Sequence, residues 1–305
     1  MHNTFRPSLL VGSVLALALL APVGPAASAD LGGGDKPQLV EPMAAQNPWS
    51  FSFTTYGWLP WLSGNTTIKG RALVVDIAPD QVISALDWSG LPAWMSYAEA
   101  RNGRLTLFND IVYSKLAGSG DFAKSGKLGI ATLTGNVKTD YEQATIELGA
   151  AYELWASGPP GTTGATGLAV LAGGRYWHQE TEVSSDVDVN GGLGILPISG
   201  VRSFDRSGSV DWVDPFVGAR VRYQLAPGHE FVVRGDIGGF GAGSDFTWQV
   251  VATSYWQLCV SDDYVIDAYL GYRALSVDYS QGSGNTKYEY DVLQQGPVIG
   301  MTMRF

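Results

Sequence analysis

The sequence has little of what several common classes of protein require. Beyond residue 29, no stretch reaches the roughly 18 to 20 apolar residues of a transmembrane helix. The single cysteine, Cys259, excludes an internal disulfide framework. Basic residues number 19 against 29 acidic ones. This balance argues against nucleic acid as a partner, because phosphate binding requires a basic surface.

The first 29 residues have the pattern of a secretory signal peptide. Arg6 precedes an apolar run from Leu9 to Leu20, and Ala27-Ser28-Ala29 supplies the small residues of a cleavage site. A membrane anchor is the alternative, but the run is interrupted and is shorter than a spanning helix. We therefore expect residues 1–29 to be removed on export. Residues 30–48 are rich in Gly and Pro and have no hydrophobic period, so we expect a flexible periplasmic tail.

From Phe51 onward, alternation of apolar and polar residues predicts long β-strands. The clearest examples are Thr139–Leu154, Val213–Leu225, Phe246–Leu258 and Tyr264–Tyr272. Strands of soluble sheets usually have about five to six residues, whereas the strands of membrane barrels show alternation over about 10 residues. The length of these segments therefore favours a membrane barrel.

A secreted β-sandwich is the alternative fold, with apolar residues facing a core and polar residues facing water. Two features weigh against it. The polar faces combine charged residues with large aromatics and Gly, as expected of a crowded polar interior. Aromatic residues such as Tyr264 and Tyr272 bracket the apolar stripes, as girdles at the two membrane interfaces would. We therefore expect residues 49–305 to form a single antiparallel transmembrane β-barrel, an all-β fold, because lipid requires closed sheets.

Turn-like breaks between the long strands indicate how many strands there are. Four breaks, which we place on the periplasmic side, separate five up-and-down pairs: Arg101–Arg104, Ala156–Thr166, Ala226–His229 and Ser261–Asp263. We therefore expect 10 strands, with both termini in the periplasm. A barrel of 12 strands is the alternative, because Thr66–Ile77 has the pattern of an extra hairpin or of a β-ribbon within a loop. Pro79–Leu86 is predicted to form a short helix in an early loop, and Glu182–Gly208 a long polar connection outside the cell.

Several blocks of the sequence together resemble a known family. They are YAEARNGRLTLFNDIVYSKL (Tyr97–Leu116), GGRYW (Gly173–Trp177), WVDPFVGARVR (Trp212–Arg222), RGDIGGFGAGSDFTWQ (Arg234–Gln249), LGYRALSVDYS (Leu270–Ser280) and GPVIGMTMRF (Gly296–Phe305). Over most of its length after the signal peptide, the chain resembles a family of uncharacterised outer-membrane β-barrel proteins of Gram-negative bacteria. The resemblance implies the fold and a location in the outer membrane, but no reaction or ligand.

The last residues, VIGMTMRF (Val298–Phe305), have a strand pattern in which every second residue is apolar. Barrels of the kind that the chain resembles end on such a strand with a terminal aromatic residue, which the barrel-assembly machinery recognises before the barrel closes. The resemblance implies this role as an assembly signal for Phe305, together with Met303 and Met301. We also expect Phe305 to anchor the chain in outer-membrane lipid at one interface.

Alternation also assigns charged residues of both signs to the inward face. The candidate lumen-lining residues are Asp110, Glu147, Arg175, Asp214, Arg220, Arg222, Arg234, Asp236 and Arg273. Arginine in a confined interior favours bidentate pairing with carboxylates. Barrels of roughly 10 to 12 strands lie between filled eight-stranded barrels and water-filled porins. We therefore expect a narrow, partly bridged pore with weak ion selectivity, which small solutes can pass.

Catalytic and metal-binding patterns are weak. Only His178 and His229 follow the signal peptide, and no serine-hydrolase spacing surrounds them. Asp186–Gly191 lacks the later Glu of a calcium loop, and Gly235–Gly243 is not followed by the helix of a dinucleotide-binding motif. We expect no cofactor and no metal. Three classes of function remain: a porin-like channel, which the sequence favours, a structural envelope barrel and, least favoured, an outer-membrane enzyme acting on lipid or peptide.

Overall fold

An antiparallel β-sheet closes on itself in the described part of the chain. The computed structural model describes residues 49–68, 70–125, 131–193 and 196–305. β1 (Trp49–Trp58) pairs with β12 (Tyr288–Arg304) and with β4 (Ala93–Asn102), which closes a ring of β1 and β4 to β12. The other strands of the ring are β5 (Leu105–Ser125), β6 (Ala131–Ser157), β7 (Thr166–Leu193), β8 (Leu196–Ala226), β9 (His229–Gly238), β10 (Phe246–Val260) and β11 (Val265–Gln281). The expected 10-stranded barrel is confirmed, while the predicted signal peptide and periplasmic tail lie outside the described residues.

Two additional strands form a hairpin beside the ring. After a break at Leu59 and Pro60, β2 (Trp61–Ile68) continues the path of β1 along β12, and β3 (Arg71–Ile77) pairs with β2. The predicted extra hairpin is thus present, but its strands lie outside the 10-stranded ring. The predicted short helix is α1 (Pro79–Ser84), and a 3-10 turn, η1 (Gly284–Thr286), precedes β12. Among the described residues, no helix is long and apolar enough to cross a membrane.

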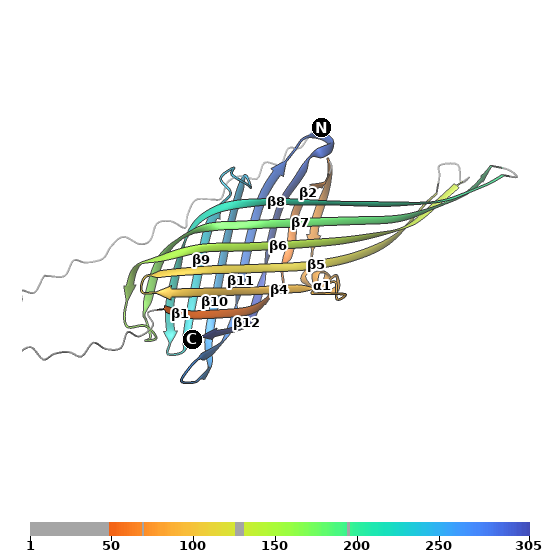
Figure 1. The fold of residues 1–305 in the computed structure, drawn as a ribbon. Coiled ribbons are helices and arrows are strands. Elements are labelled where there is room, and N and C mark those ends of the chain that lie inside the picture. Colours follow the sequence, from red (N-terminus) through yellow and green to blue (C-terminus); the bar gives the residue numbers. More distant parts are fainter. Residues whose placement is uncertain (1–48, 69, 126–130, 194–195) are drawn as a thin grey trace, which may run out of the picture. The chain divides into compact units, whose positions relative to one another are not determined.

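The strands of the ring differ greatly in length. β5 to β8 have 21, 27, 28 and 31 residues, whereas β1, β4 and β9 have 10 each. Figure 1 shows β5 to β8 running side by side far beyond the other strands. Since a spanning strand needs about 9–11 residues, these four strands continue beyond the membrane. The expected polar connection at Glu182–Gly208 is wrong, because most of this segment lies in β7 and β8. The segment forms strands because its two halves pair in register, from Glu182 opposite Ser207 to Leu193 opposite Leu196.

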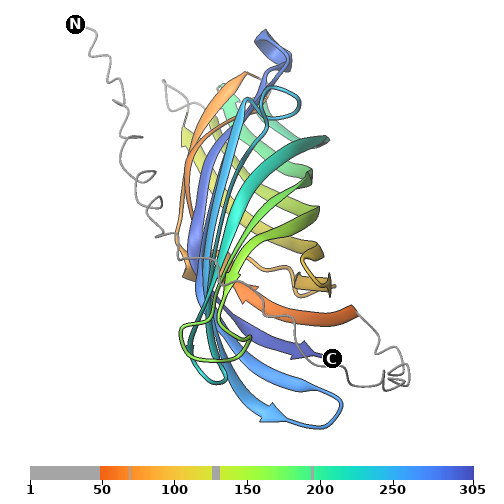
Figure 2. The same ribbon diagram turned by 90° about the vertical axis from the view of Figure 1, so that its left-hand side faces the viewer.

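All four predicted turns lie at one end of the barrel, together with the start of β1 and the end of β12. Trp49 lies opposite Asn102, and Ser52 lies opposite Arg304. Gly103 and Gly228 adopt positive φ angles of 58° and 74°, which allow tight turns there. We call this the short-turn end and the opposite one the long-strand end. Figure 2 shows β5 to β8 (yellow to green) in one half of the barrel wall and β9 to β12 (cyan to blue) in the other half.

The outward face carries an apolar band bordered by aromatic residues. Leu148, Val213 and Ile299 each expose more than half of their surface, at 62%, 54% and 60%. Exposed aromatic residues towards the short-turn end are Phe51, Tyr152, Tyr223, Trp256 and Phe305. Tyr176 and Phe246 border the band on the other side. A continuous apolar surface of this kind is unfavourable in water, whereas an apolar band between aromatic girdles is the lipid-facing surface of a membrane barrel.

Candidate functional site

Six charged residues cross the middle of the barrel interior. We call these three carboxylates and three arginines the ionic layer: Asp110, Glu147, Arg175, Arg234, Asp236 and Arg273. Strand register brings them together, since Asp110 lies opposite Glu147 and Glu147 lies opposite Arg175. Strand alternation turns all three of these side chains inward. Each side chain of the layer is at most 8% exposed.

Glu147 is the centre of the ionic layer. Its Oε1 accepts a hydrogen bond from Arg175 Nε at 2.8 Å, and its Oε2 accepts one from an Arg234 terminal nitrogen at 2.8 Å. Arg273 lies 3.4 Å from Oε1, and Gln249 donates to the same atom at 3.1 Å. One carboxylate thus contacts three guanidinium groups. Removing one partner of such a buried cluster typically costs about 3–5 kcal/mol.

The two aspartates complete the charge balance of the layer. Asp236 accepts from Arg175 at 2.8 Å and pairs with Arg234 at 2.9 Å. Asp110 accepts from Arg273 at 2.8 Å and from the Tyr56 hydroxyl at 2.6 Å. Each arginine of the layer therefore contacts an aspartate in addition to Glu147. The layer is electrically neutral and is bonded across five different strands.

Aromatic rings pack against the guanidinium groups and fill the space between them. Arg234 lies over the rings of Phe108 and Phe216, at 4.8 and 5.3 Å from their centroids. Arg273 lies 4.9 Å from the Trp58 ring in the same way. Glycine makes room for these rings, because a Cβ at Gly149 would lie 2.4 Å from the Phe108 ring. Cation–π contacts stabilise arginine in such an environment, and they leave little space for water between the ion pairs.

Aromatic and aliphatic side chains fill the interior between the ionic layer and the long-strand end. Trp212 stacks on Trp177 and on Tyr279, with ring centroids 5.4 and 4.1 Å apart. Buried aliphatic residues of this aromatic layer are Val112, Leu275, Val277, Val292 and Val298. The candidate lumen-lining residues imply an interior that is polar along its whole length. The structure corrects this expectation, because this part of the interior is apolar. Along the barrel axis, the ionic layer is thus followed by the aromatic layer towards the long-strand end.

Asp214 lies in the aromatic layer. It is fully buried and accepts hydrogen bonds from Trp177 Nε1 at 3.0 Å and from the Ser244 hydroxyl at 2.8 Å. The Ser244 backbone N–H donates to its other oxygen at 2.6 Å. No cation pairs with Asp214 among the described residues, so neutral donors alone hold this carboxylate. It fixes the turn between β9 and β10 against β8.

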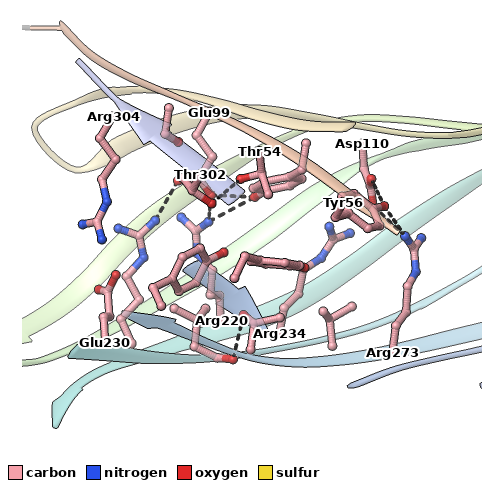
Figure 3. Close-up of a pocket in the computed structure, with 18 residues that line it drawn as sticks. Thr54, Tyr56, Glu99, Asp110, Arg220, Glu230, Arg234, Arg273, Thr302 and Arg304 are labelled. Atoms are coloured by element: carbon pink, nitrogen blue, oxygen red, sulfur yellow. Dashed lines mark hydrogen bonds and ion pairs between the residues drawn. The ribbon is translucent and has the colours of Figure 1, made fainter. Parts of the chain in front are cut away.

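A cavity of about 110 Å³ lies between the ionic layer and the short-turn end. Figure 3 shows Glu99 between the arginines that face it and shows Asp110 beside Arg273. Glu99 pairs with Arg220 and accepts from Arg222 at 2.8 Å, and Tyr97 donates to it at 2.5 Å. The cavity is a part of the interior that a small molecule could occupy without displacing a side chain.

The structure places the nine candidate lumen-lining residues on the inner face but does not bring them into one group. Six of them form the ionic layer, Asp214 lies in the aromatic layer, and Arg220 and Arg222 line the cavity. Sequence reasoning missed Glu99, which pairs with Arg220 and Arg222, and Gln249, which donates to Glu147. Glu99 has the same inward parity on β4 as Tyr97, so alternation could have identified it.

The two histidines lie apart on the outer surface. His178 Nδ1 is 2.7 Å from an Asp211 oxygen, to which the Tyr176 hydroxyl donates at 2.6 Å. His229 is within 2.8 Å of the Ser254 hydroxyl and stacks on Trp256. Within the described ranges, no group of three or more potential metal ligands occurs. Neither histidine contacts the cavity, whose lining contains no histidine.

The closed ring of antiparallel strands, the apolar outward band and the charged interior define an outer-membrane-type β-barrel.

No protein-family model and no curated protein matches the chain. Among solved structures, it is similar to the outer membrane protease OmpT from Escherichia coli, with a TM-score of 0.43, 9% identity and coverage of 87% of this chain and 99% of that one. It is also similar to Neisserial surface protein A, with a TM-score of 0.26, 12% identity and coverage of 85% of this chain and 96% of that one. For a Pseudomonas aeruginosa FadL homologue, the TM-score is 0.24, the identity 7%, and the coverage 84% of this chain and 89% of that one. The closed ring of strands in this chain, and not these low similarities, confirms the fold that the resemblance to outer-membrane barrels implies.

Proposed function

We propose that the protein is a structural barrel of the Gram-negative outer membrane that is closed to solutes at rest. In this proposal, a cleaved signal peptide exports the chain, and the barrel-assembly machinery recognises Phe305, Met303 and Met301. The short-turn end faces the periplasm, because short turns are usual on that side and long extensions on the other. The observation that carries the proposal is the buried, fully paired ionic layer across the interior.

A resting pore requires a continuous path of water through the barrel. The ionic layer leaves its six side chains at most 8% exposed. Behind it, Trp177 and Val277 have no exposed surface. A solute would have to separate buried ion pairs, which leaves charges uncompensated in the interior, and would then have to displace the stacked rings. Both barriers support a closed barrel.

The extended strands support a structural role at the cell surface. β5 to β8 are joined to one another over most of their length and continue past the end of β9 at Gly238. In the proposed orientation, this four-stranded sheet stands outside the cell. The tightly bonded barrel, in contact with outer-membrane lipid through the apolar band, would then anchor this external sheet to the membrane.

A narrow porin-like channel for small solutes, which the sequence favours, is the second candidate. The cavity favours it, because a solute could occupy this space from the short-turn end. The ionic layer would then act as a gate that opens only transiently. The third class, an enzyme, has no support from the geometry described, and the similarity to a protease concerns the fold alone.

Swelling of proteoliposomes distinguishes these candidates. We expect vesicles that contain the folded protein to swell in glycerol or arabinose no faster than empty vesicles. An Arg234→Ala/Trp212→Ala double variant, which removes one side chain from the ionic layer and one from the stacked rings behind it, is the positive control and should increase the rate. Fast swelling with the unaltered protein would favour the channel and reject the closed barrel.

A further inference from the structure

The cavity at the short-turn end presents more positive than negative side chains (Figure 3). Its charged lining residues are Arg220, Arg222, Arg234, Arg273, Arg304, Glu99, Asp110 and Glu230. Some of the carboxylates that balance these arginines lie behind them. Asp236 pairs with Arg234, and Asp267 accepts from Arg304, but neither aspartate belongs to the lining. The inner wall of the cavity is therefore cationic, although the interior as a whole is nearly balanced.

Several guanidinium groups around the cavity have donors that are not used. Arg222 forms one ion pair and Arg304 forms one, although a guanidinium has about five N–H donors. Their side chains are 22% and 43% exposed, so the remaining donors are accessible. The Nε atoms of Arg220 and Arg234 also have no hydrogen-bond partner, but they have almost no accessible surface, so a guest in the cavity does not contact them. Arg222 and Arg304 therefore favour an acceptor that occupies the cavity.

The carboxylates deeper in the cavity are already occupied. Glu99 uses one oxygen for Arg220 and Tyr97 and the other for Arg222. Asp110 accepts from Tyr56 with one oxygen and from Arg273 with the other. A cationic guest would have to compete with arginine for each of these carboxylates. An anionic guest meets unused donors and needs to displace nothing.

Access to the cavity is from the short-turn end. The side chain of Arg304 is 43% exposed, that of Arg222 is 22% exposed and that of Arg220 is 7% exposed. At the floor, Arg273 is 2% exposed. On the same measure of volume, one water needs about 10–15 Å³. The cavity of about 110 Å³ therefore has room for a group of several non-hydrogen atoms.

We propose that this cavity binds a small oxyanion, a carboxylate or a phosphate group, which enters from the short-turn end. Arg222 and Arg304 contact it at the mouth, and Arg220 contacts it further in. Guanidinium groups suit this guest because their paired N–H donors match the oxygens of carboxylates and phosphates. These three arginines lie outside the ionic layer, whose Asp110, Arg234 and Arg273 form the inner wall of the cavity, so the proposed contacts do not depend on whether the layer stays closed.

Isothermal titration calorimetry of the folded full-length protein in detergent tests this site, with acetate and inorganic phosphate as separate probes at low ionic strength. We expect one-to-one binding of at least one probe, and the probe that binds identifies the class of guest. Arg222→Gln should weaken binding by about tenfold or more, because a charge-assisted hydrogen bond is lost. Glu99 keeps Arg220 and Tyr97 as partners in this variant.

Two further variants separate the site from general effects of charge and folding. Lys115→Gln removes one positive charge far from the cavity, where Lys115 pairs with Asp87, and should bind as the unaltered protein does. Val232→Phe keeps every charge but fills the cavity, which Val232 lines, and should abolish binding. Folding of each variant is checked by its altered gel mobility before and after heating. Absence of binding with both probes, equal loss in Lys115→Gln, or full binding by a folded Arg222→Gln or Val232→Phe variant would overturn the proposal.

Discussion

Replacing Glu147 by glutamine removes the negative charge that three arginines share. The neutral side chain keeps nearly the same size, so the change acts on charge and not on packing. In the unaltered protein, Arg175 and Arg234 each donate to Glu147 at 2.8 Å, and Arg273 lies at 3.4 Å. The variant leaves a net positive charge in a layer whose side chains are at most 8% exposed.

The expected loss follows from the partners that remain. Breaking a buried ion pair costs about 3–5 kcal/mol. Arg175 and Arg234 still contact Asp236, and Arg273 still contacts Asp110. We therefore expect Glu147→Gln to lower the free energy of unfolding by about 3 kcal/mol, at the lower end of that range.

Urea unfolding of the barrel in lipid vesicles measures this loss, and Glu153→Gln on the same strand is the matched control. Glu153 pairs with Arg101 at 2.9 Å, but the two side chains are 20% and 33% exposed. Such partly solvated pairs contribute about 0–1 kcal/mol. Equal losses in the two variants, or a Glu147→Gln barrel as stable as the unaltered one, would refute the role of the ionic layer.

Three other predictions concern the termini, the lipid-facing surface and the turn between β9 and β10. Deleting Phe305, which stacks on Phe51 at 6.1 Å, should slow assembly in cells, and normal levels of heat-modifiable barrel would contradict this. Leu148→Arg should lower stability in vesicles by about 2–4 kcal/mol, and Leu154→Arg, nearer the short-turn interface, by about 0–1 kcal/mol; equal losses would contradict the assigned depth. Ser244→Ala removes the hydroxyl that donates to Asp214 and should cost about 1–3 kcal/mol and expose the turn to protease. A turn that is cleaved no faster than in the unaltered protein would show that this contact is not needed.

Alternation predicted the strands and turns well because lipid and a polar interior impose opposite chemistry on the two faces of a strand. On β6, Glu147 faces inward and Leu148 outward, so the assignment of faces follows directly from the sequence. The turn at Asn102 and Gly103 carries the local signal of a tight hairpin. These features depend on neighbouring residues, which is why they could be predicted without the fold.

The filling of the barrel could not be predicted in the same way. Near the long-strand end of β11, Leu275 and Val277 face inward, whereas Ser276 and Asp278 face outward. The two-residue alternation continues there, but the apolar residues now face inward and the polar residues face outward. Alternation alone therefore does not show where the outer face of the barrel passes from lipid to water. The partners of Asp214 come from β7 and from the turn after β9, and the ionic layer combines five strands. Such contacts depend on register and closure, which single-strand patterns do not contain.

Single-channel recording in planar bilayers tests the closed barrel most directly. The Arg234→Ala/Trp212→Ala double variant serves as the control for insertion, since opening both layers should give a small leak that favours cations. For the unaltered protein inserted under the same conditions, the account predicts no discrete current. Stable, discrete conductance steps from the unaltered protein would contradict it.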